Sequence, residues 1–98
     1  MDGKDQAWPD DLCAYRRTPD FTERTIPAGL LRGHSTKQGV WAKLHVLEGR
    51  LLFRDLVGRT ERVLEPGIHP LIHPQALHEV APQGFVRFFV EFHARGPR

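Results

Sequence analysis

Two histidines stand where a β protein could build a polar site. His34 follows Gly29 and Gly33 at the entrance of an expected strand, and His78 follows Pro74 at the start of another. A barrel can bring two such strand ends together despite their distance in sequence. Imidazole nitrogen is a common ligand for zinc, iron, nickel and copper, so a shared metal ion is one chemistry this pair could support.

The segment RFFVEFH (87–93) supplies a candidate third ligand, Glu91. Alternation in a strand places Glu91 with Arg87 on one face and Phe88 and Val90 on the other. An interior Glu91 would need a metal or a cation to compensate its buried charge. Two His and one carboxylate with open positions form the arrangement of non-haem iron sites, and zinc, nickel and manganese fit it nearly as well. The alternative is that Glu91 points outward or pairs with Arg87.

Residues beside His34 could bind the ligand itself. Thr36 offers a hydroxyl and Lys37 a positive charge, which together suit a small anionic or oxygen-rich molecule. Trp41 could form the wall of a pocket. The alternatives are that Thr36 and Lys37 belong to a solvated loop and that Trp41 is part of the core.

Other kinds of chemistry find little support. No glycine-rich phosphate loop precedes a helix, and neither GxSxG nor HExxH occurs. The single cysteine, Cys13, excludes an internal disulfide and a CxxC zinc site, which fits a reducing compartment. No apolar run approaches the roughly 18 residues that span a bilayer. We therefore expect a cytoplasmic protein without membrane contact.

Composition indicates one ordinary globular domain. The chain has 98 residues and a formal net charge of +2. Its basic residues are scattered among acidic ones, and Arg16-Arg17 is the nearest approach to a basic patch, so we expect no nucleic-acid partner. A domain this short leaves apolar surface uncovered, which favours a homodimer.

The elements that must position these residues are strands. Pro and Gly interrupt the chain about every ten residues, which leaves little room for helices. The runs between them alternate with a period of two, as antiparallel strands of a sandwich or barrel do. We expect strands over 40–47, 50–56, 61–64, 68–73, 78–81 and 85–93, with turns at 57–60 and 82–84.

We divide the chain into a flexible N-terminal segment (1–11), a β domain (12–93) and a C-terminal tail (94–98). The segment 15–33 is the least decided part of the domain. It could be an extended arm that packs across a partner.

Four segments together resemble the TehB/YeaR-like family of small bacterial cupin domains. They are YRRTPDFTERTIPAGLL (15–31), HSTKQGVWAKLHVLEGRL (34–51), PGIHPLIHPQALHEV (66–80) and VRFFVEF (86–92). The most specific parts are His34-x-Thr36-Lys37-x-Gly39-x-Trp41 and Pro74-x-x-x-His78. The resemblance covers about residues 12–93.

The resemblance implies an all-β cupin fold, a double-stranded β-helix or jelly-roll-like antiparallel barrel. In the cupin pattern one motif gives two His and a Glu, and a second motif gives one more His. His34 matches the first His and His78 the last, but Thr36 stands in place of the second His and no Glu lies near 40–42. Some similar proteins carry this domain in front of a methyltransferase linked to tellurite resistance, a partner domain for which we expect no room in this chain.

Three hypotheses follow. The leading one is a small cupin that holds a divalent metal (zinc, iron, nickel or manganese) through His34, His78 and Glu91 and presents it to a small anionic molecule, with a possible link to tellurite or other stress resistance. The second is a metal-free module that binds a small ligand. The third is a dimerisation module without catalysis, whose interior would be packed solid.

Overall fold

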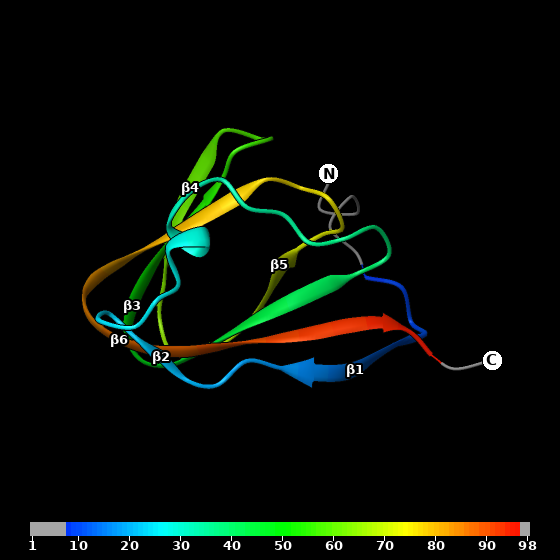
Figure 1. Cartoon of the computed structure of the whole chain (residues 1–98), viewed down its shortest axis with the longest axis horizontal. Helices are drawn as coiled ribbons and strands as arrows, with labels where there is room; N and C mark the ends of the chain where they lie inside the picture. The colour runs from blue at the N-terminus through cyan, green and yellow to red at the C-terminus, as the bar shows by residue number, and fades with distance from the viewer. Residues whose placement is uncertain (1–7, 97–98) are drawn as a thin grey trace.

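Two alternating apolar patterns form the two long strands of the fold, β3 (Trp41–Asp55) and β6 (His78–Arg95). This computed structural model describes residues 8–96. The two strands pair antiparallel along nearly their whole length (Figure 1). Side chains alternate between a buried side of this pair, the core face, and the opposite side, the outer face. The core face includes Ala42, Leu44 and Val46 of β3 and Phe88 and Val90 of β6, all of them buried.

Shorter strands extend the sheet on both sides. β1 (Leu12–Arg17) and β2 (Phe21–Thr22) pair with β6, whereas β4 (Thr60–Leu64) and β5 (Gly67–Ile72) pair with β3. Every pairing is antiparallel, and the main path of the sheet runs β1-β6-β3-β4. The 3₁₀ helix η2 (Ala28–Leu31) packs against β6 and lies over one side of the curled sheet (Figure 1).

Gly49 allows the two long strands to bend together. Its φ of +77° is a left-handed conformation that favours glycine, and a Cβ built there would lie 1.9 Å from the carbonyl oxygen of Phe85. The pairing of β3 with β6 shifts register next to this position, between Gly49 and Leu51. The bend curls the sheet around its own apolar side chains.

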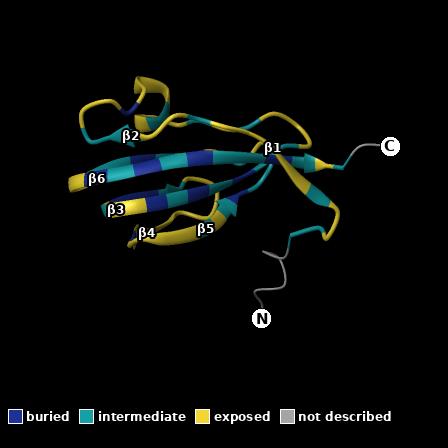
Figure 2. Ribbon diagram, turned by 90° about the horizontal axis from the view of Figure 1, so that it is seen from below, coloured by how far each residue is buried: buried dark blue, intermediate teal, exposed yellow. Residues whose placement is uncertain are grey.

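Burial follows this curl. In Figure 2 the buried residues lie along the middle of β3 and β6, whereas most of β4 and β5 is exposed. Phe88, Leu44, Leu51, Leu64 and Val86 are the largest fully buried side chains in the described part of the chain. The core therefore lies inside the curl, where the candidate site must also be.

The structure confirms the prediction of a single small all-β domain with an antiparallel sheet. The finer prediction of a cupin barrel is not confirmed, because the path of the sheet among residues 8–96 does not close. The expected turn at 82–84 is wrong, since β6 continues through it and shifts in register absorb the irregularity. The segment 15–33 contributes β2, η2 and the buried Ile26 to its own chain's core.

The proposed division of the chain stays a prediction. The expected flexible segment 1–11 and tail 94–98 lie partly outside the described residues, whose limits are 8 and 96. Within those limits β1 begins at Leu12 and β6 ends at Arg95. No helix in the described range has the length and apolar character needed to span a membrane.

Candidate functional site

His34 and His78 are direct partners across a short antiparallel bridge. The backbone N–H of each donates to the carbonyl of the other, at N···O distances of 2.9 and 2.8 Å. Residues that pair in this way present their side chains on the same face. The two rings accordingly meet edge to face, with 5.4 Å between their centroids. The prediction that these distant histidines converge is therefore realised in the backbone pairing.

His78 is the more deeply buried of the two. It is 3% exposed, and its ring stacks on Phe53 with 5.7 Å between centroids. Its Nδ1–H donates to the carbonyl oxygen of Ala76 at 2.9 Å. Burial, reinforced by the neighbouring His34, lowers the pKa of His78 below its ordinary value, although the bond to Ala76 and the carboxylate of Asp55 oppose that change. The neutral imidazole is thus the favoured form.

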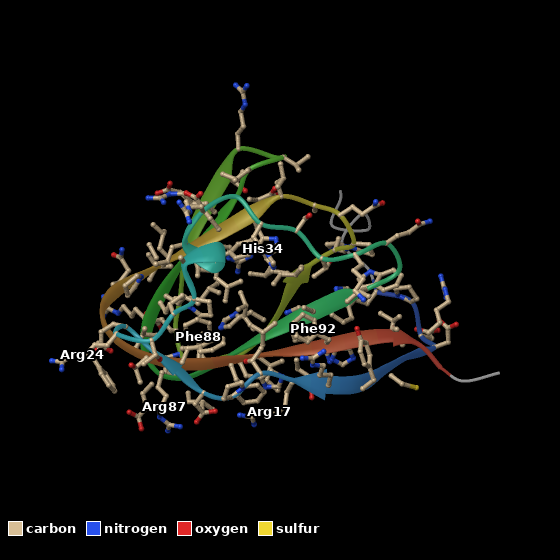
Figure 3. The ribbon with its side chains drawn as sticks, in the orientation of Figure 1. Arg17, Arg24, His34, Arg87, Phe88 and Phe92 are labelled. Atoms are coloured by element: carbon tan, nitrogen blue, oxygen red, sulfur yellow. The ribbon has the colours of Figure 1, made fainter. Side chains whose placement is uncertain are left out.

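Both rings line a cavity of about 220 Å³ inside the curl, which we call the inner chamber. Its walls are almost entirely apolar and come from β2, η2, β3, β5 and β6 and from the loops beside them. They include Leu30, Leu44, Ile72, Val80, Phe88 and Phe92. Figure 3 shows His34 above this hollow and Phe88 and Phe92 on the side of β6 that faces it. A bare dimerisation module would require a solidly packed interior. This interior contains a cavity instead.

A second hollow of about 440 Å³, the vestibule, adjoins the chamber. Thr18, His34, Thr36 and Phe92 line both spaces. The remaining walls of the vestibule come from the end of β1 and from the loop that follows His34. They are Tyr15, Arg16, Arg17, Pro19, Ser35, Lys37 and Val40.

The vestibule is positively charged. Three basic residues and no acidic residue are among its described walls. Arg16 pairs with Phe92 in the sheet, so its side chain lies on the core face with that of Phe92. Among residues 8–96, neither Arg16 nor Lys37 forms an ion pair. Arg17 pairs instead with Asp20 at 2.6 Å, and its guanidinium lies over the ring of Phe89 on the outer face. Arg16 and Lys37 therefore provide the uncompensated charge.

The three predicted ligand-binding residues have different positions. Thr36 lines both hollows, and its hydroxyl donates to the carbonyl of Val40 at 2.8 Å. Lys37 lines the vestibule alone. Trp41 lies on the outer face, since its neighbour Ala42 faces the core, and the guanidinium of Arg95 is 5.8 Å from its ring centroid. The structure thus brings Thr36 and Lys37 to the histidine pair but not Trp41.

Glu91 also lies on the outer face, away from His34 and His78. One carboxylate oxygen, Oε1, accepts hydrogen bonds from Nε2 of His45 at 3.0 Å and Nε2 of His93 at 2.9 Å. Burial alone would raise the pKa of Glu91, but these two bonds outweigh it and hold the pKa below its usual range. The predicted set of His34, His78 and Glu91 is therefore not assembled. The described residues contain no group of three side chains suited to a metal ion.

Sequence reasoning missed two parts of this arrangement. From the sequence alone, Arg16 is considered only as half of the Arg16-Arg17 pair and not as part of a site, because nothing in the sequence says which strand it borders. The cluster of His45, Glu91 and His93 could have been found, since alternation puts each residue on one face of its own strand and antiparallel pairing joins those faces.

The comparisons with known proteins now identify the family. The model of the TehB-like domain matches residues 16–90. The chain belongs to the TehB-like family. A relative from Haemophilus influenzae, named probable S-adenosyl-L-methionine-dependent methyltransferase TehB, is 36% identical over 71% of this chain but only 26% of its own length. This chain thus spans about a quarter of the curated relative it matches.

Solved structures agree with the fold. The crystal structure of TehB from Haemophilus influenzae has a TM-score of 0.79 and 30% identity, covering 88% of this chain and 32% of that one. A protein from Escherichia coli strain K12 has a TM-score of 0.82 and covers 93% of this chain and 98% of its own. Its identity of 21% supports the fold alone.

These findings correct the leading hypothesis. The predicted divalent metal, and with it the cupin-type metal-binding function, is wrong. The curated relatives are named as probable S-adenosyl-L-methionine-dependent methyltransferases, and no metal site occurs among residues 8–96. The physical reason is alternation: Glu91 belongs to the face opposite His34 and His78, where two other histidines already bond to it.

Proposed function

We propose that this chain is a ligand-binding domain that holds a small amphiphilic anion. The apolar body of the ligand lies in the inner chamber, and its negative group lies in the vestibule near Arg16 and Lys37. The observation that carries this proposal is the direct junction of an apolar cavity with a cationic one at His34 and Thr36. Ligand sites commonly combine such apolar walls with a few convergent polar groups.

The volume of the chamber suits one ring or a short branched chain. Its 220 Å³ exceeds the roughly 150 Å³ of an apolar protein cavity that admits benzene. Burying an apolar group of that size contributes about 2 to 3 kcal/mol. Uncompensated cations at the mouth would add roughly 0.5 kcal/mol each at an exposed site. Together these terms amount to about 3 to 4 kcal/mol, and association has its own entropic cost, so a minimal probe should bind with a Kd no tighter than about 1 mM.

The cofactor named for the relatives does not fit these hollows. S-adenosyl-L-methionine carries a sulfonium cation and a ribose diol, and carboxylates are the usual partners of such a diol. No Asp or Glu lines either hollow, and the vestibule already holds Arg16, Arg17 and Lys37. We therefore assign methyl-donor binding to the part of the relatives that this chain does not match, and ligand binding to the matched part.

An NMR titration with 3-phenylpropanoate tests this proposal. We expect amide resonances of residues that line both hollows to shift, and the uncharged 3-phenylpropanamide to bind more weakly. The double variant Arg16→Gln/Lys37→Gln should bind the carboxylate about fivefold more weakly, and added salt should weaken wild-type binding. Arg24→Gln is the matched control, because Arg24 is an exposed arginine that lines neither hollow (Figure 3).

Two results would count against the function. One is saturation with no shift in the chamber or the vestibule. The other is equal binding of the carboxylate and the amide by wild-type protein, which would remove the role of the positive charge.

A homodimer and a cytoplasmic location stay part of the proposal. The exposed Val63 and Ile68 on β4 and β5, 47% and 62% exposed, are apolar surface that a second copy could cover. Sedimentation equilibrium tests the dimer: a single species of monomer mass across micromolar to millimolar concentration would exclude it.

A further inference from the structure

The two ring nitrogens of His78 have different surroundings. Nδ1 is bonded to the carbonyl oxygen of Ala76, which can only accept a hydrogen bond, so Nδ1 must carry the proton. In the neutral ring Nε2 is then a hydrogen-bond acceptor with a free lone pair. No described residue hydrogen-bonds to this nitrogen.

Nε2 of His78 is also accessible. Among the described residues, the only side-chain nitrogen or oxygen that is both fully buried and without a hydrogen bond is Nε2 of His73, so Nε2 of His78 is not fully buried. His78 is 97% buried, and it lines both the inner chamber and a neighbouring hollow of about 200 Å³ on the side of Asp55, so its unbonded nitrogen borders open space rather than solid protein. Because burial lowers the pKa of His78, this acceptor keeps its lone pair near neutral pH.

The protein offers this acceptor no donor. Thr36 and Thr18 are the hydroxyl residues of the chamber, and their hydrogens go to the carbonyls of Val40 and Pro19. His34 meets His78 edge to face without a hydrogen bond between the rings. An acceptor held in an apolar cavity without a partner is costly, and a bound molecule can remove that cost only by donating to it.

We propose that the natural ligand carries a hydroxyl or N–H group on its apolar body, and that this group donates to Nε2 of His78 inside the chamber. This inference rests on the proposed function, because it concerns the same ligand. The anionic group of that ligand lies in the vestibule, and its hydrogen-bond donor lies in the inner chamber. The ligand class is a small hydroxylated carboxylate or a related anion, with one ring or short chain between its two polar groups.

The test compares 3-(4-hydroxyphenyl)propanoate with 3-phenylpropanoate, which lacks only the hydroxyl group. We expect the hydroxylated probe to bind wild-type protein about three- to tenfold more tightly, as one net hydrogen bond provides. We also expect it alone to move the ¹⁵N resonance of Nε2 of His78. The His78→Phe variant should bind the two probes with about equal affinity. His69→Phe, at a histidine that lines neither hollow, should keep the preference.

The outcomes separate the two proposals. If both probes bind wild-type protein equally and Nε2 does not move, this inference is overturned while the proposed function stands. If neither probe binds, both fail. Should His78→Phe not fold, the wild-type affinity ratio and the Nε2 resonance decide the question without it.

Discussion

Substituting Gly49 by alanine should damage the bend that encloses the chamber, and Gly84 provides a matched control. Both glycines have a φ of +77°. They differ in space: a Cβ at Gly49 would lie 1.9 Å from the carbonyl oxygen of Phe85, whereas one at Gly84 would meet no atom within 4 Å. The pair therefore separates the cost of a left-handed alanine from the cost of a backbone clash.

The magnitudes follow from these contacts. An alanine with positive φ costs roughly 1 to 2 kcal/mol, which is the whole effect expected for Gly84→Ala. At Gly49 the same cost applies, and the strands must also move apart by about 1.5 Å to restore a normal contact, which adds roughly 2 to 3 kcal/mol. We expect Gly49→Ala to lose about 3 to 5 kcal/mol, a large share of the stability of a domain this size.

Urea denaturation followed by circular dichroism measures the difference. With a slope of about 1 to 3 kcal/mol per molar urea, the midpoint of Gly49→Ala should lie about 1 to 2 M below that of Gly84→Ala. Gly84→Ala should bind 3-phenylpropanoate as wild-type protein does. Equal midpoints for the two variants would refute the close approach of β3 and β6 at Gly49.

Four further outcomes are expected. Glu91→Gln should lower the free energy of unfolding by about 1 kcal/mol, because the charged acceptor of His45 and His93 is lost, and should leave probe binding unchanged; weakened binding would place Glu91 in the site after all. The melting temperature should fall as the pH drops below 6.5. The reason is that burial lowers the pKa of His78 in the folded state, so the unfolded chain takes up more protons than the folded one. An unchanged melting temperature would contradict that burial effect. Leu44→Ala should cost about 3 kcal/mol in urea denaturation and admit a bulkier ring to the enlarged chamber; unchanged probe selectivity would show that Leu44 does not limit the space. A chelator should change neither melting temperature nor probe binding, and a loss of either would restore the metal hypothesis.

Much of the sheet could be predicted from alternation. The faces of 41–46 and 88–92 follow the sequence, because a half-buried strand must place apolar residues on one side. The lengths of β3 and β6 could not be predicted. A glycine or proline inside a long strand reads as a turn, whereas here Gly49 and Pro82 lie at bends that the paired strand follows.

The site could be predicted only in part. Each histidine at a strand entrance was identifiable, but their pairing as His34 opposite His78 depends on which strand ends meet. The face of Glu91 was open from its own strand alone and is decided by His45 on the neighbouring strand. Arg16 becomes part of the vestibule only through its pairing with Phe92. Long-range register, which short sequence patterns do not encode, therefore decides which of the predicted residues lie together.

The most direct test of the account is a crystal structure of the protein with 3-(4-hydroxyphenyl)propanoate bound. We expect the ring between Leu44 and Phe88, the carboxylate near Arg16 and Lys37, and the hydroxyl at Nε2 of His78. An empty chamber with the probe on the outer face beside Glu91 would contradict the proposed function.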